Sequence, residues 1–470
     1  MEGTLASKND RVSHLASPAE KTGLTKQGVA REEDNDNEQK RCAQDQLDDA
    51  ETMILKADAL TAKPVPSSPA PETGPETPPG KPDAKADEGN SKESLLTKAE
   101  ALLLSAASDA AGNSAQEPRV NKARRLFLEA RIRALRGEQG SSELLSRAVK
   151  LNPRNADAWN HLAEALWRDG NLKEARDCLL SSLEQGPEKA TLRNYSMLLR
   201  KLDGTAKEKA DNMTESLARA KAAVALDVGD AESWYVLGNT YMAYFFALSH
   251  DLRNLEAALK AYRRSEDLGS GAANPDLYYN RAQVFTFLEN FPSAVSDYER
   301  AHTLDGTLGA ASRARALRDR VKSLALAVER KGRIKPKRLV ALQGQLARSS
   351  SPDDALCLSD LKAEQNADSK LEIMILSNAS VPGSPPATFI ALDRNGHVFA
   401  VSVFHLDDTA QTRLAGSRER IVLCNPLFRT VELDGVSYPS VQIQHPAQVL
   451  LNGIALESSF AHATLATSTI

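Results

Sequence analysis

The sequence predicts a mostly α-helical protein in which a solenoid of helical hairpins is followed by a small β-barrel. Three observations indicate this fold. Residues 156–187 have the spacing of large and small apolar side chains that a helix–turn–helix unit needs. Related spacing recurs in register between residues 119 and 310. From about residue 370, short β-rich runs separated by turn residues replace the helical spacing.

The stretch 156–187 shows how one unit is built. Trp159, Leu162 and Leu166 are three or four residues apart and therefore share one helix face. The residues 169–171, Asp-Gly-Asn, separate two helices, and Pro187 ends the unit. This is the spacing of a tetratricopeptide repeat. Because one hairpin cannot bury its apolar stripe alone, neighbouring hairpins must stack on it.

The bulk composition sets limits on function. The chain has 470 residues and a net charge of −4, so any basic binding site must be local. Its four cysteines are far apart and form no CxxC pair, which indicates a reducing compartment without disulfides or a zinc site. We find no N-terminal apolar run and no apolar stretch of membrane-spanning length. We therefore expect a cytoplasmic protein, with the nucleus as a second compartment.

Taken in order, the chain predicts five regions. Residues 1–118 are expected to be a disordered or partly helical arm, with helical pieces at about 40–62 and 92–110. Residues 119–310 form the solenoid. Its third unit, from about residue 190, is degenerate because a charged insertion moves the second helix to about 214–226. The fourth unit has a first helix about two turns too long.

The remaining three regions follow the solenoid. Residues 311–347 are expected to form basic capping helices, with eleven Lys and Arg against two acids between residues 311 and 340. Residues 348–368 read as a linker. Residues 369–470 hold five or six short strands, including the Asn395-Gly396 signal of a tight hairpin, and an OB-like barrel is the best interpretation.

Catalytic motifs are absent from the sequence. It has no P-loop, GxGxxG, HExxH or GxSxG, and its eight histidines lack ligand spacing. We therefore expect no enzyme activity, no cofactor, no metal, no small-molecule substrate and no membrane partner. A solenoid is in general a scaffold for binding other molecules.

The expected groove lies beside the packing stripe of the first helices. If Trp159, Trp234 and Tyr278 are equivalent, the positions two before, one after and five after them carry carboxylates, amides and tyrosines. They are Asp157, Glu232, Asp276, Asn160, Tyr235, Tyr279, Glu164, Asn239 and Gln283. Such a groove suits an extended peptide with an amine or an Arg. The alternative is that acids simply favour helix starts, and that Asp276 caps a helix.

Two other features leave alternatives open. Arg200 and Arg281 stand where a hydrophobe is expected, so each is either a groove ligand or the buried partner of a nearby acid. The basic stretch 313–338 either meets phosphates or is a solvated capping helix, and alone it favours the helix. In the barrel, the few aromatics are expected to fill the core. They are Phe399, Phe404, Phe428 and Tyr438.

Residues 119–456 resemble the tetratricopeptide repeat protein 5 family, also called Strap. The matching stretches are ELLSRAVKLNP, WNHLAEALWRDG, SMLLRKL, SWYVLGNTY, NPDLYYNRA, ERKGRIKPKRL and LLNG. The resemblance implies tubulin autoregulation, in which the nascent tubulin N-terminus is recognised at the ribosome and mRNA decay follows through decay adaptor proteins. It also implies a second role, as a nuclear stress-responsive cofactor of an acetyltransferase coactivator.

The resemblance also assigns residues. Arg200 and Asp276 match the family's peptide-holding Arg and Asp, and Lys335 and Lys337 match its lysines that contact ribosomal RNA. A further acid of the family falls near Ala310, where this chain departs. The candidate peptide-binding residues are Arg200, Asp276, Asp157, Glu232, Asn239 and Tyr279. The candidate ribosome contacts are Lys335, Lys337, Arg333 and Arg338. A third hypothesis, single-stranded RNA binding by the barrel, has weaker support.

Overall fold

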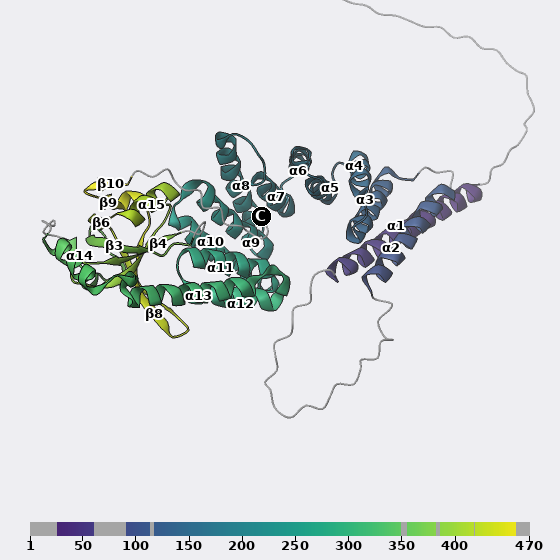
Figure 1. Ribbon diagram of the computed structural model, residues 1–470. Helices are drawn as coiled ribbons and strands as arrows, with labels where there is room; N and C mark the ends of the chain where they lie inside the picture. Colours follow the sequence, from purple (N-terminus) through teal and green to yellow (C-terminus); the bar gives the residue numbers. More distant parts are fainter. Residues whose placement is uncertain are drawn as a thin grey trace, which may run out of the picture. The chain divides into compact units, whose positions relative to one another are not determined.

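The structure is a computed structural model that describes residues 26–60, 91–112, 117–348, 355–381, 386–417 and 419–456 (Figure 1). The disorder expected for the rest of residues 1–118 lies outside these ranges. The described residues fall into two compact units, the first ending at Gly140 and the second beginning at Ser141. Within these ranges, we find no helix that is both long and apolar enough to cross a membrane.

The first unit contains three helices, α1 (Lys26–Ala59), α2 (Lys92–Gly112) and α3 (Arg119–Arg136). α2 occupies the stretch 92–110 for which a helix was expected, whereas α1 begins at Lys26, well before the expected start at about residue 40. Ile54, Leu96 and Leu128 are buried between them. Ion pairs add to this packing: Arg131 lies 2.6 Å from Asp58, and Arg136 lies 2.8 Å from Glu100. The arm therefore includes a packed helical part.

The second unit begins with the repeats, as the sequence predicts. Its helices pair as α5 with α6, α7 with α8, α9 with α10, and α11 with α12. Their bounds are α4 (Ser141–Leu151), α5 (Ala156–Arg168), α6 (Leu172–Gln185), α7 (Lys189–Leu199), α8 (Ala206–Leu226), α9 (Ala231–Tyr244), α10 (Leu252–Asp267), α11 (Pro275–Phe287), α12 (Phe291–Leu304), α13 (Ala310–Glu329) and α14 (Pro336–Arg348). The predicted solenoid of helical hairpins is confirmed.

The long first helix of the fourth unit has a local cause. α9 continues into a π-helical segment, Phe245–Ser249, which ends where His250 turns left-handed at φ 50°. Asp251 then caps α10 by accepting a hydrogen bond from the Arg253 amide at 3.0 Å. The small residue Gly238 lets α10 approach closely, because a Cβ there would come within 2.7 Å of the Tyr262 ring.

The β-domain follows α14. Its elements are β1 (Ala355–Leu356), β2 (Glu364–Gln365), β3 (Lys370–Asn378), β4 (Ala387–Leu392), β5 (Val398–Val403), α15 (Asp408–Gly416), β6 (Ile421–Cys424), β7 (Leu427–Leu433), β8 (Val436–Ile443), β9 (Val449–Leu451) and β10 (Ile454–Ala455). The strand order is β10-β9-β6-β3-β4-β5-β8-β7-β2, with β1 beside β3. A register shift between Ile375 and Ser377 lets β3 pair with β6 along its first half and β4 along its second.

Part of the expected linker 348–368 belongs to the β-domain. β1 pairs with β3 in parallel, and β2 pairs with β7. A strand is recognised in a sequence by apolar and polar residues that alternate over at least four positions. β1 and β2 have two residues each, so the sequence did not reveal them.

The last repeats and the β-domain share one core. Strand β4 is buried along its whole length, so both of its faces are covered. Phe389 and Phe399 face the interior of the β-domain. Ile390, Phe404 and Tyr438 instead pack with Phe287 and the helices of the last repeats, and Figure 1 shows α13 running beside the strands. The solenoid is thus closed at this end by the sheet.

Glu289, in the turn between α11 and α12, links the last repeats to the β-domain; this contact region is called the joint. Its carboxylate is buried, and it accepts hydrogen bonds from Ser402 Oγ at 2.5 Å, Gln442 Nε2 at 2.6 Å and Ser440 Oγ at 3.4 Å. Its backbone is left-handed, with φ 55°. The corresponding turn between α5 and α6 uses Gly170, with φ 84°. A residue that tolerates this backbone poorly therefore stands here because its side chain reaches β5 and β8.

Candidate functional site

The repeat register is visible in one recurring hydrogen bond. The ring N–H of Trp159 donates to Pro153 O at 2.8 Å, and that of Trp234 donates to Val228 O at 3.0 Å. The Tyr278 hydroxyl lies 3.3 Å from Ala272 O, and its nearer acceptor is Glu266 Oε1 at 3.0 Å. Each of the three contacts with a backbone oxygen spans six residues, so these three positions are equivalent, and the residues counted from them occupy comparable places on successive helices.

Arg200 follows α7 as its C-terminal cap residue. All three nitrogens of its guanidinium are buried without a hydrogen-bond partner. Burial lowers the pKa of Arg200 to about 10, against a smaller opposing effect of the Tyr262 and Tyr235 phenols. The guanidinium is still charged at neutral pH. A buried charge without a counter-ion is costly, so the position favours an anion that the chain itself does not supply.

A polar floor joins the helices around Arg200. Tyr262 Oη donates to Asn239 Oδ1 at 2.7 Å, and Asn280 Nδ2 donates to the same oxygen at 3.1 Å. Asn280 Nδ2 also lies 3.4 Å from Tyr235 Oη. Burial raises the pKa of Tyr262, which keeps its hydroxyl protonated. Asn239 is only 2% exposed, so it supports the floor from within.

Asp276 lies in the first turn of α11, one turn before Asn280. The capping role belongs to Asn274, whose Oδ1 accepts from the amides of Asp276 at 3.0 Å and Leu277 at 3.3 Å. Asp276 is therefore not the cap. Its own Oδ1 is buried without a hydrogen-bond partner. An acid in this turn is stabilised by the helix dipole, yet one oxygen remains free for a cationic group.

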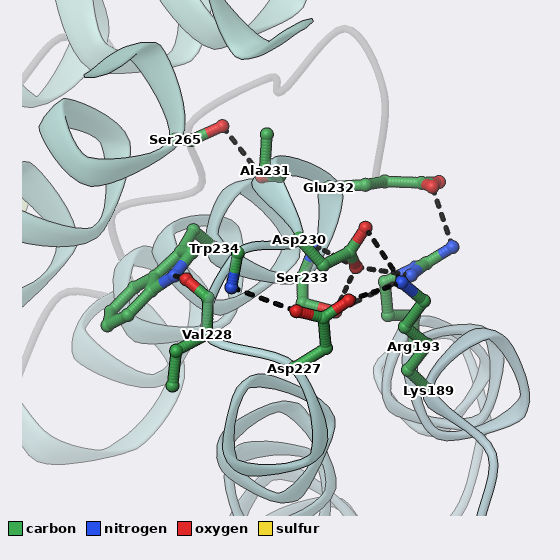
Figure 2. Close-up of polar contacts among 11 residues, drawn as sticks. Lys189, Arg193, Asp227, Val228, Asp230, Ala231, Glu232, Ser233, Trp234 and Ser265 are labelled. Carbon is green, nitrogen blue, oxygen red and sulfur yellow. Dashed lines mark hydrogen bonds and ion pairs between the residues drawn. The ribbon is translucent and has the colours of Figure 1, made fainter. Parts of the chain in front are cut away.

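The other predicted peptide contacts lie in different settings. Asp157 is exposed at the start of α5. Glu232 lies 2.6 Å from Arg193 on α7. Figure 2 shows this ion pair as a dashed line. Arg193 also lies 2.6 Å from Asp230, the cap of α9. Tyr279 is buried and meets the ring of Tyr298 edge-on, with centroids 5.4 Å apart. The structure thus places Arg200 near Tyr262, whose hydroxyl donates to Asn239. Glu232 and Tyr279 have other intramolecular partners.

The structure decides between the two alternatives for Arg281. Its Nε and Nη2 donate to the carboxylate of Asp297 at 2.7 and 2.8 Å, and its Nη1 donates to Glu266 at 2.6 Å. Burial opposes the charge, but these hydrogen bonds raise the pKa of Arg281 above its ordinary value. Arg281 is the buried partner of two acids.

The predicted ribosome contacts lie in a basic turn, defined as residues 330–338, which follows α13 and includes the first residues of α14. Arg333, Lys335, Lys337 and Arg338 are all exposed. Gly332, with φ 61°, presses the turn against β3, because a Cβ there would lie 2.9 Å from Leu376 Cβ. The cations crowd the N-terminus of α14, where the helix dipole disfavours them, so a bound anion would relieve their repulsion.

Two further predictions concern Ala310 and the barrel aromatics. Ala310, the first residue of α13, is fully buried in the core shared with the sheet. The place where the resemblance implies an acid is therefore a packing position here. Phe399, Phe404 and Tyr438 are buried and Phe428 is half-buried, which fits their expected role in the core. Sequence reasoning missed Asn280 and Glu289, whose partners come from other elements.

Comparisons with known proteins agree with this architecture. A family model described as the tetratricopeptide repeat protein 5 OB fold domain matches residues 354–465, and a tetratricopeptide repeat model matches residues 139–190. Tetratricopeptide repeat protein 5 of Homo sapiens is 30% identical over 334 residues, which is 67% of this chain and 76% of that protein. The Bos taurus protein is 30% identical over 348 residues, 69% of this chain and 79% of that protein.

Proposed function

The chain belongs to the tetratricopeptide repeat protein 5 family, a family of protein-binding adaptors, and from this premise we propose a specific client. The chain binds the nascent N-terminal peptide of tubulin in its repeat groove while it contacts ribosomal RNA through the basic turn. Binding recruits decay adaptor proteins to the translating mRNA. The protein acts without enzymatic chemistry, in the cytoplasm.

The observation that supports this proposal is the buried, unpaired guanidinium of Arg200. A peptide carboxylate would supply its missing counter-ion, and the resulting charge-assisted hydrogen bonds would form out of water, where they are strong. Asp276 offers a free buried oxygen to an Arg or an amine of the same peptide. Asp276 is negatively charged and Arg200 is positively charged. The groove therefore favours a short peptide that carries both a cationic and an anionic group.

The basic turn supplies the second contact of the proposal. Exposed Lys335 and Lys337 meet phosphates in water, so their contribution should weaken as salt rises. Arg200 and Asp276, which act in a buried setting, should respond much less to salt. The groove and the basic turn belong to one chain. If both bind the ribosome–nascent-chain complex at once, the overall affinity exceeds that of either contact alone.

The experiment is binding of the purified full chain to a fluorescent tubulin N-terminal peptide. We expect specific binding that falls roughly tenfold or more in Arg200→Gln and Asp276→Asn, because each removes a charge-assisted hydrogen bond. Lys201→Gln and Asp211→Asn are matched controls, since both residues are exposed and neither is a predicted groove contact. Equal affinity of all five proteins would contradict the groove assignment. A second set of binding measurements uses ribosome–nascent-chain complexes and tests the double variant Lys335→Gln/Lys337→Gln.

A further inference from the structure

An open cavity of about 580 Å³ lies between α13, the basic turn and the end of β3. Its apolar lining includes Leu326, Ala327 and Val381, and its cations are Arg320, Arg330 and Arg333. The volume falls within the range of small-molecule pockets, roughly 300–1,000 Å³. Neither the predicted peptide contacts nor the predicted lysine contacts account for it.

The lining combines exposed aliphatic surface with positive charge. Leu326 is 39% exposed and Val381 is 45% exposed, which is unusual for aliphatic side chains that lie in one hollow. Arg330 and Arg333 are exposed at one end. Arg320 is fixed by its hydrogen bond to Thr388 Oγ1 at 3.2 Å. Asp319, Ser377 and Asn378 add polar groups to the wall.

The positive charge does not stop at the cavity. From Arg330 to Arg348 the sequence has no acidic residue, and six cations fall between residues 330 and 338. A surface with this density of cations matches the repeating phosphates of a nucleic-acid strand. The cavity therefore lies where a strand that follows the basic turn would pass.

We propose that this cavity takes a single unpaired nucleotide of the RNA that the basic turn contacts, an inference that rests on the proposed ribosome contact. Arg330 and Arg333 bind the flanking phosphates. The base leaves its stack and lies against Leu326, Ala327 and Val381, with a guanidinium beside its face. Asn378 and Asp319 face the polar edge of the base. Proteins read RNA most readily at such unstacked nucleotides.

The probes for the test are two fluorescent RNA hairpins that differ by one bulged nucleotide. With the full chain, we expect the bulged hairpin to bind about fivefold more tightly than the fully paired one. This is the low end of what base stacking gives, because the described residues that line the cavity include no aromatic side chain. Leu326→Ser should abolish the preference and leave affinity for the paired hairpin unchanged. Val340→Ser, an exposed valine on α14 outside the cavity, is the matched control.

Charge is tested separately from the cavity floor. Arg330→Gln should weaken binding of both hairpins and lower the slope of affinity against salt by about 1. Arg315→Gln, an exposed arginine of α13 outside the cavity, should change neither. Together with Leu326→Ser, this variant separates phosphate contact from base contact.

Three results would overturn the inference. The first is equal affinity for the two hairpins. The second is a preference for the bulge that survives Leu326→Ser. The third is displacement of the bulged hairpin by an acidic, leucine-containing peptide at lower concentration than unlabelled RNA, which would assign the cavity to a protein partner. If the unaltered chain binds neither hairpin nor ribosomes, the proposed ribosome contact itself is wrong, and that outcome differs from all three.

Discussion

Arg200 holds a buried charge that no other described side chain neutralises, and this has a consequence for stability. Replacing Arg200 with Met keeps the length and removes the charge. We expect the free energy of unfolding to rise by about 1–3 kcal/mol, because the cost of desolvating the guanidinium disappears. Peptide affinity should fall in the same variant. Urea denaturation, with Lys201→Met as the control, measures the first effect. A loss of stability would mean that the guanidinium is well solvated in the free protein.

His405 gives the molecule a pH response. It is 4% exposed, and burial together with His250 and His445 lowers its pKa to about 4. The unfolded chain, with an ordinary pKa near 6.5, binds the proton more readily. The contribution of neutral His405 to the free energy of unfolding is therefore fully present above about pH 6.5. It is lost as the pH drops from about 6.5 to about 4, which lowers the free energy of unfolding by about 1–3 kcal/mol.

The variant His405→Asn tests this response, because Asn tolerates the left-handed backbone of this position, φ 58°. The slope of unfolding free energy between pH 4 and 6.5 should become shallower. His302→Asn, at an exposed position on α12, is the matched control. An unchanged slope in His405→Asn would assign the pH response to other groups.

At the scale of elements, two effects oppose each other at Glu289 in the turn between α11 and α12. Its left-handed backbone is unfavourable, whereas its hydrogen bonds to β5 and β8 are favourable. Glu289→Gly removes an unfavourable left-handed glutamate, which alone would stabilise the turn by about 1 kcal/mol. It also removes the closest acceptor of two buried donors, Ser402 and Gln442, at about 1–3 kcal/mol each. We expect a net loss of about 2 kcal/mol in chemical denaturation. A net gain would show that the carboxylate contributes little to the joint.

The same elements show what the sequence could and could not predict. Trp159 and Trp234 marked the repeats, because the apolar spacing within a hairpin is local. Arg200 was recognised as unusual for the same reason: it replaces an expected hydrophobe. The partner of Glu232 is Arg193, on the preceding helix pair, and the partners of Glu289 lie more than a hundred residues away. Such pairs depend on how elements pack, which residue spacing does not reveal.

At the scale of the whole second unit, the repeats and the β-domain should unfold together. Ile390, Phe404 and Tyr438 belong to the core of the last repeats, so a β-domain made alone would expose them. All three tryptophans, Trp159, Trp167 and Trp234, lie in the repeats and report on them. We expect tryptophan fluorescence and hydrogen exchange of β5 and β8 to change at the same urea concentration. Two separate transitions would show that the joint is weak.

The carboxylate of Glu289 also bears on where the groove is most rigid. In a stack of repeats, a terminal hairpin has a neighbour on one side only and normally frays first. Here the hairpin α11–α12, which presents Asp276, has the sheet on its outer side. Its amides should therefore exchange with solvent more slowly than those of α5–α6. A ligand held at Asp276 would meet a preorganised surface and lose little binding energy to ordering the protein.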